Sequence, residues 1–159
     1  SATNQYGYYG EQRNRGLELS LFGTPVETVR LLSSATWIDA ELTETNDGLN
    51  EGNQAVGVAG SRYVVGGEWD IPGVQGWTAL ANVVRTGSQY ADAANTLELS
   101  PWTRLDLGVR YTKPFNDNTL TVRANVENIT NEDYWASATG GYLTQGNPLT
   151  AKLSASWSF

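Results

Sequence analysis

The stretch Leu149–Phe159 reads LTAKLSASWSF, and its apolar residues alternate strictly with polar ones. In a β-strand, successive side chains point to opposite faces, so such a segment has one apolar and one polar face. An amphipathic helix would instead repeat its apolar residues every three or four positions. The stretch therefore predicts a β-strand, and the same alternation can be sought upstream.

Six upstream stretches share a strand-like pattern, which brings the expected number of strands to seven. Four of them alternate cleanly, at 17–22, 62–71, 104–112 and 119–127. Two alternate less regularly, at 29–42 and 77–88. In these two, four apolar side chains fall out of phase, namely Leu32, Ile38, Leu80 and Val84.

The connections between these stretches alternate in length. Three are short and marked by Pro or Gly, at 23–28, 72–76 and 113–118. Three are long and polar, at 43–60, 89–100 and 129–147. Short turns at one end of a sheet and long loops at the other are typical of up-and-down barrels in outer membranes.

Strand length and aromatic content also favour a membrane protein. Several stretches are about ten residues long, enough for a tilted strand to cross a bilayer, whereas strands of soluble proteins average about five or six. The chain has 6 Trp and 8 Tyr but only 3 Phe, and rings with a polar tip are favoured at membrane–water interfaces. The sequence therefore predicts an all-β fold, an antiparallel up-and-down transmembrane β-barrel segment of about seven strands.

Composition excludes several classes of function. The chain of 159 residues has a formal net charge of −7 and neither His nor Cys, so it lacks the groups that Ser-His-Asp catalysis, zinc sites and redox motifs need. Its 10 Lys and Arg against 17 Asp and Glu argue against a nucleic-acid partner. We expect no enzyme, no metal site and no cofactor. Two alternatives stay open: a small structural or enzymatic outer-membrane barrel, and a soluble β-sandwich that binds carbohydrate.

Three internal motifs and the C-terminal residues have recognisable counterparts. Residues 125–135 read NVENITNEDYW, residues 15–20 read RGLELS and residues 106–111 read DLGVRY. They resemble the N-V-x-N-L-T-[ND]-x-x-Y, R-G-x-E-[LV]-x and D-L-G-x-R-Y motifs of TonB-dependent outer-membrane receptors, especially ferric-siderophore receptors. Trp157 and Phe159 are similar to the terminal aromatic assembly signal of that family. The chain departs from the family at Leu149, where many members have Arg.

The resemblance implies a barrel of twenty-two strands around an N-terminal plug domain, with a TonB box ahead of the plug. Residues 1–159 would be the C-terminal part of this barrel, its last seven strands, with the plug domain and the TonB box absent. The implied function is energy-coupled uptake of ferric siderophores at the bacterial outer membrane. This part would supply barrel wall and ligand-binding loops, without catalysis. The lack of His argues against haem as the ligand.

The partners that the resemblance implies are a ferric siderophore, the TonB complex through N-terminal regions absent here, outer-membrane lipid and the barrel assembly machinery. Seven strands alone would leave two unpaired sheet edges. We therefore expect the isolated fragment to oligomerise, to swap strands or to close in a non-native way.

Four aromatic residues in or beside the long connections are candidates for ligand binding: Tyr142, Tyr134, Trp135 and Trp102. The resemblance places these connections on the extracellular side, where aromatic rings line the pocket for an iron chelate. Tyr142 is the first choice, because it stands beside glycines and outside any regular strand. The alternatives are a loop tyrosine without a role for Tyr142, and an outer aromatic belt for Trp102 and Trp135.

Charges predict the register of the hairpin formed by 104–112 and 119–127. Pairing Arg104 with Glu127, or Asp106 with Arg123, sets opposite charges face to face, whereas a further slip sets Arg104 against Arg123. Like charges directly opposed destabilise a sheet, so we expect one of the first two registers.

Deletion of Phe159 from the intact receptor tests the assembly signal. The strand 149–159 should turn its apolar residues, Trp157 and Phe159 included, toward lipid. The deletion should lower the amount of receptor in the outer-membrane fraction while total synthesis stays unchanged. A truncated receptor that reaches the outer membrane at normal levels would contradict the prediction.

Overall fold

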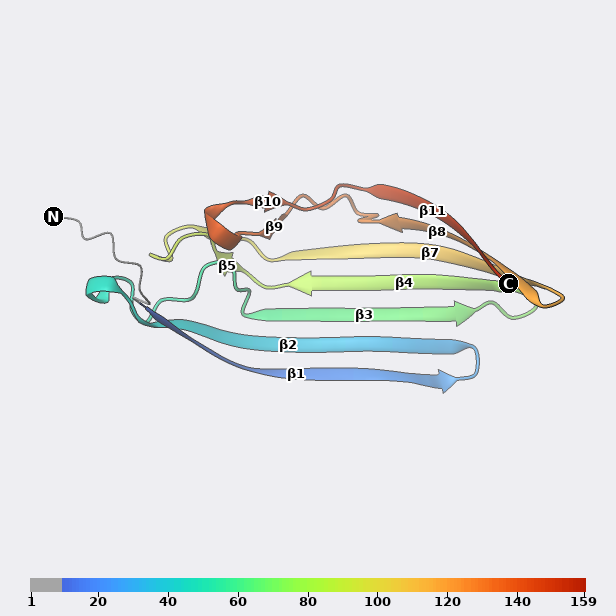
Figure 1. Ribbon diagram of the computed structural model, residues 1–159, viewed down its shortest axis with the longest axis horizontal. Coiled ribbons are helices and arrows are strands. Elements are labelled where there is room, and N and C mark those ends of the chain that lie inside the picture. The colour runs from blue at the N-terminus through green and yellow to red at the C-terminus, as the bar shows by residue number, and fades with distance from the viewer. Residues whose placement is uncertain (1–9) are drawn as a thin grey trace.

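The computed structural model describes residues 10–159, and one antiparallel sheet of seven long strands dominates it (Figure 1). These strands are β1 (Glu11–Val26), β2 (Val29–Glu44), β3 (Ser61–Asp70), β4 (Trp77–Thr86), β7 (Trp102–Phe115), β8 (Asn118–Glu127) and β11 (Thr150–Ser158). They lie in the sheet in their order along the chain. The expected seven strands and their up-and-down arrangement are confirmed.

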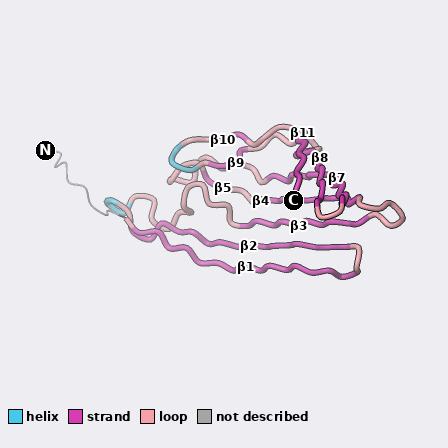
Figure 2. The backbone as a smooth tube through the Cα atoms, turned by 45° about the vertical axis from the view of Figure 1, so that its right-hand side comes forward, coloured by secondary structure: helices cyan, strands magenta, loops and turns pink. Residues whose placement is uncertain are grey.

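The remaining elements are short and lie in the three long connections. They are η1 (Asn46–Gly48), β5 (Gln89–Tyr90), β6 (Glu98–Leu99), β9 (Trp135–Ser137), η2 (Thr139–Gly141) and β10 (Thr144–Gln145). Figure 2 shows them gathered at one end of the sheet, which we call the loop end. Within residues 10–159, no helix is long and apolar enough to cross a membrane.

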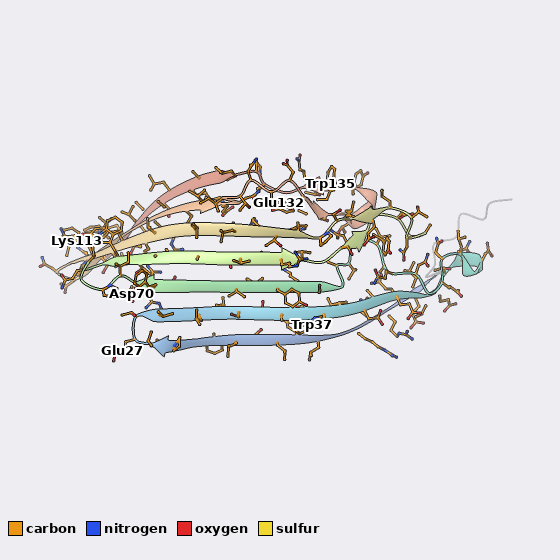
Figure 3. The ribbon with its side chains drawn as sticks, turned by 180° about the vertical axis from the view of Figure 1, so that it is seen from behind. Glu27, Trp37, Asp70, Lys113, Glu132 and Trp135 are labelled. Atoms are coloured by element: carbon orange, nitrogen blue, oxygen red, sulfur yellow. The ribbon has the colours of Figure 1, made fainter. Side chains whose placement is uncertain are left out.

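The short connections lie at the opposite end, the turn end, where Figure 3 labels Glu27, Asp70 and Lys113. The expected turns 23–28 and 113–118 are mostly strand, because β1 and β7 run on through the prolines at 25 and 114. The pairing of β1 with β2 is irregular between Gly23 and Val26, and β7 extends past the end of β4. Each proline thus lies where the regular ladder is interrupted on one side, and a missing N–H is tolerated there.

The register gives the sheet two distinct faces, as the alternation predicts. One face joins apolar pairs such as Val65 with Val83 and Leu153 with Ala124. The other carries most of the charged side chains of the central strands, such as Glu68 and Arg110, and also the four out-of-phase residues. We call them the apolar face and the polar face. Near the strand ends, charged residues such as Arg85 and Lys113 fall on the apolar face. Leu153 is 78% exposed on the apolar face, so this surface is available for contact with lipid.

Aromatic side chains gather near both ends of the apolar face. At the loop end, Trp37 Nε1 donates a hydrogen bond to the Tyr63 hydroxyl at 2.8 Å, and the two rings meet edge to face with centroids 5.6 Å apart. At the turn end, Phe115 packs against Trp157, also at 5.6 Å. Aromatic belts on both sides of an apolar band are typical of a transmembrane barrel wall.

An ionic network on the polar face joins β2, β3, β4 and β7 near the turn end. Arg30 makes a bidentate pair with Asp70, with both N–O distances 2.7 Å, and its Nε donates to Glu68 at 3.1 Å. Arg110 makes a bidentate pair with the same Glu68, at 2.9 Å and 2.9 Å. The Thr78 hydroxyl donates to Asp70 at 2.6 Å. Such paired charges fix the relative positions of neighbouring strands.

The expected register of the β7–β8 hairpin is wrong. Arg110 lies directly opposite Arg123, so neither Arg104–Glu127 nor Asp106–Arg123 forms a facing pair. The pair of like charges that we expected to be avoided, Arg104 with Arg123, does not form either.

Two features outweigh the like-charge pair of Arg110 and Arg123. The tight turn after Phe115 sets Phe115 opposite Asn118 and thereby fixes every later pair. In addition, the Arg110 guanidinium is held by Glu68, two strands away across β4. Facing pairs alone therefore could not predict this register, because the compensating charge comes from a strand outside the hairpin.

Glu68→Gln tests this compensation. Loss of the carboxylate should leave Arg30 and Arg110 without a shared counter-charge and should destabilise the intact receptor by about 1 kcal/mol, the scale of a partly exposed ion pair. Thermal unfolding of the purified receptor measures the effect. Glu127→Gln, which removes the more exposed pair with Lys152, is the matched control and should change less. Equal effects of the two variants would contradict the account.

Candidate functional site

The first two long connections form a joint structure at the loop end. Gly57 N–H donates to the Tyr90 carbonyl at 2.9 Å. Asn95 bonds the backbone of Gln54 twice, accepting from its N–H at 2.8 Å and donating to its carbonyl at 3.0 Å. Asn53 donates to the Ala93 carbonyl at 2.9 Å. The connections 45–60 and 87–101 are therefore held to each other rather than independent.

The third long connection, 128–149, packs against this pair. A Cβ on Gly57 would lie 3.3 Å from both the Ala138 carbonyl carbon and the Thr139 nitrogen. Ala55 and Ala138 are almost fully buried. The three connections thus form one packed block, which we call the loop cap (residues 45–60, 87–101 and 128–149).

The loop cap is strongly acidic. It contains six carboxylates and neither Lys nor Arg. The acids are Asp47, Glu51, Asp92, Glu98, Glu132 and Asp133. Their field repels anions and attracts cations, and at physiological salt it acts over about 8 Å.

Asp92 organises the tip of the second connection. Its carboxylate accepts hydrogen bonds from the Thr96 hydroxyl at 2.7 Å, the Leu97 N–H at 2.8 Å and the Thr96 N–H at 3.0 Å. Because these donors favour the charged form, the Thr96 hydroxyl first and the Leu97 amide next, the pKa of Asp92 lies below its usual value. The carboxylate therefore holds this turn in one conformation.

Asn128 closes the base of the third connection. Its side chain is fully buried and donates to the carbonyls of Glu132 and Asn147, both at 2.9 Å, while its Oδ1 accepts from Glu132 N–H at 2.9 Å. Asn131 Oδ1 accepts from Leu149 N–H at 3.0 Å. The motif 125–135 therefore acts as a structural clip that ties the beginning of this loop to its end. Both asparagines have positive φ, a conformation that asparagine adopts more readily than most residues. The residue type at these two positions was therefore the sequence signal for such a clip.

The structure separates the four aromatic candidates into two kinds. Trp102 and Tyr134 are 8% and 9% exposed and stack with ring centroids 4.1 Å apart. Trp102 lies opposite Thr86 on the polar face, which excludes it from the outer aromatic belt. Trp135, labelled in Figure 3, and Tyr142 are 44% and 78% exposed. A binding role for these four residues stays a prediction, and exposure favours Trp135 and Tyr142.

A comparison with known families identifies the chain. Residues 1–129 match the family described as "TonB dependent receptor-like, beta-barrel". The chain belongs to the TonB-dependent receptors. These are outer-membrane proteins, so this receptor chain is part of an outer-membrane barrel. Membership of the family removes the soluble β-sandwich and the small outer-membrane barrel that the sequence left open.

Curated relatives of this receptor chain are several times longer than it is. The ferrichrome receptor FcuA of Yersinia enterocolitica is 62% identical over 160 residues, which cover 99% of this chain and 21% of the relative. The metal-pseudopaline receptor CntO of Pseudomonas aeruginosa is 27% identical, over 94% of this chain and 21% of its own length. The chain spans about a fifth of the length of these relatives.

Solved receptor structures share the fold. BauA, the ferric preacinetobactin receptor of Acinetobacter baumannii, superposes with a TM-score of 0.86 at 44% identity, over 94% of this chain and 22% of that one. The ferric citrate transporter FecA superposes with a TM-score of 0.79 at 21% identity, over 94% of this chain and 25% of that one. The relatives in both comparisons are thus transport receptors rather than enzymes.

Asp92→Ala tests the organisation of the second connection. The variant should lose amide protection at Thr96 and Leu97, measured by hydrogen exchange in the intact receptor. In the wild type, a lowered folded-state pKa means that the stabilisation is present at neutral pH and is lost only as the pH falls through that lowered value. Protection that disappears at the pKa of an ordinary aspartate, or that survives in Asp92→Ala, would contradict this account.

Proposed function

We propose that this chain forms the C-terminal seven strands of a receptor for energy-coupled uptake of a ferric siderophore, with ferrichrome as the first ligand to test. The observation that carries this proposal is the 62% identity to a ferrichrome receptor, which extends over 99% of the chain and so includes all three long connections. Ligand-binding residues in proteins of this architecture lie mostly on loops. A relative that aligns over the strands and over all three long connections is therefore the best guide to the first ligand to test.

The two faces and two ends of the sheet suggest an orientation in the membrane. The apolar face with its aromatic belts would contact lipid, and the polar face with its ion pairs would line the barrel interior. The loop cap would lie outside the cell, and the turn end would face the periplasm. In this role the chain supplies barrel wall and binding loops and carries out no catalysis.

The remaining parts of the uptake system lie outside residues 1–159. The plug domain and the TonB box would belong to the N-terminal part of the receptor, through which the TonB complex would act. Trp157 and Phe159 would provide the signal for the barrel assembly machinery. The unpaired edges of β1 and β11 support the proposal that the sheet is part of a larger barrel, because in a closed barrel each edge would pair with a further strand.

Ligand contact is assigned to the exposed hairpin 135–145 of the third connection. Tyr142 follows η2, where Gly140 and Gly141 have positive φ, and its ring projects from the tip with little cover. Trp135 pairs with Gln145 at the base of the same hairpin. Aromatic surfaces of this kind bind an uncharged chelate by stacking and by burial of apolar area.

Tyr142→Ala in the intact receptor tests this assignment. Removal of the ring should weaken ferrichrome binding by roughly fivefold to tenfold, which corresponds to about 1 kcal/mol of stacking. Binding of ferrichrome to purified receptor measures the change, and receptor abundance should stay at the wild-type level. Leu49→Ala removes another exposed apolar side chain from the loop cap and should leave binding unchanged. Wild-type affinity in Tyr142→Ala would contradict the assignment and show that Tyr142 is a surface tyrosine without a role in binding.

A further inference from the structure

The hairpin 135–145 is closed at its base by two residues that flank it directly. Tyr134 precedes the hairpin and Gly146 follows it, and Gly146 N–H donates to the Tyr134 carbonyl at 2.8 Å. The conformation of these two residues therefore sets the direction in which the hairpin projects from the rest of the loop cap.

The Tyr134 ring is enclosed on both sides. The Trp102 ring lies 4.1 Å away, centroid to centroid, at an interplanar angle of 30°. On the Gly146 side, an added Cβ would lie only 2.2 Å from Tyr134 Cζ. Space, and not backbone conformation, thus requires glycine at position 146, because its φ is not in the positive region.

The enclosed ring is connected to the barrel wall. Trp102 begins β7 and packs with Val84 and Val64 on the polar face. Arg104, two residues further along β7, lies with Nη1 3.4 Å from the Tyr134 hydroxyl and donates to Asp106 from Nη2 at 3.0 Å. Asp106 in turn accepts the Asn128 N–H at 2.9 Å. The base of the hairpin and the clip at Asn128 therefore share one support on β7.

We propose that Trp102, Tyr134 and Gly146 form a positioning stack that holds the hairpin 135–145 at a fixed angle to the rest of the loop cap, and that this stack sets ligand affinity without touching the ligand. The inference rests on the proposed function only where it concerns affinity. A hairpin without this support samples many orientations. Ordering it when the ligand binds costs free energy, which weakens the affinity.

Gly146→Ala in the intact receptor tests the stack. Chymotrypsin can cleave after the exposed Tyr142, so the cleavage rate without ligand reports how firmly the hairpin is held. We expect Gly146→Ala to be cleaved about tenfold faster than the wild type and to bind ferrichrome about tenfold more weakly, at normal receptor abundance. Gly60→Ala is the matched control, because a Cβ there meets only the Ile38 carbonyl oxygen, at 3.8 Å. It should change neither quantity.

Variants of the ring provide an independent comparison. Tyr134→Phe keeps both stacking surfaces and loses only the contact with Arg104, so its cleavage rate and affinity should stay close to those of the wild type. Tyr134→Leu removes the stack and should behave like Gly146→Ala. The comparison of Tyr134→Phe with Tyr134→Leu still tests the stack if the Gly146→Ala receptor is not inserted into the outer membrane.

The outcomes separate the two proposals. Wild-type cleavage rates in Gly146→Ala or Tyr134→Leu would overturn the positioning stack, whatever the ligand. Faster cleavage with unchanged ferrichrome affinity would overturn its role in binding. Loss of receptor from the membrane in both variants would assign the stack to assembly and overturn the proposal as well. A wild-type receptor that does not bind ferrichrome would refute that ligand alone, since the cleavage comparison needs no ligand.

Discussion

The continuous ladder of backbone hydrogen bonds from β1 to β11 is the constraint on which the rest of this structure depends. In a bilayer, an unpaired N–H or C=O group costs several kcal/mol, so a chain that crosses it as strands must pair every strand with its neighbours. The seven strands meet this requirement in their simplest order, each paired with the next. Side-chain alternation then separates a lipid-facing surface from a polar one.

Near the turn end, ion pairs join neighbouring strands across the polar face. Glu68 is shared by Arg30 on one side and Arg110 on the other. At the loop end, hydrogen bonds and aromatic stacking take over, with Asn128 and Tyr134 at the base of the longest connection. The stack of Trp102 and Tyr134 thus supports the end of the wall that carries the candidate binding hairpin.

Much of this fold could be predicted from the sequence because its dominant signal is local. Alternation at 149–159 and its repeats located all seven strands, and the long polar stretches located the loops. The register of β7 with β8 could not be predicted, because the partner of Arg110 is a residue forty-two positions earlier. Turn lengths were overestimated, because the prolines at 25 and 114 were interpreted as turn residues although they lie in strands, at places where the regular ladder is interrupted.

The candidate site was only partly predictable for a similar reason. Sequence reasoning selected four aromatic residues by type and by position in loops, which is a local criterion. It could not distinguish the buried Tyr134 from the exposed Tyr142, because burial depends on Trp102 from a distant strand and on the missing side chain of Gly146. The two asparagines of the clip carried a local signal, a preference for positive φ, that residue type alone does not connect to loop closure.

The central claim, that one side of each strand faces lipid and the other faces the barrel interior, can be measured on β11 in the intact receptor. Spin labels placed singly at positions 151–156 would report collision with oxygen, which concentrates in lipid, and with a water-soluble nickel chelate. We predict high oxygen accessibility at 151, 153 and 155 and low accessibility at 152, 154 and 156, in phase with the pairing of Leu153 with Ala124. Accessibility without a period of two, or with the opposite phase, would contradict the account.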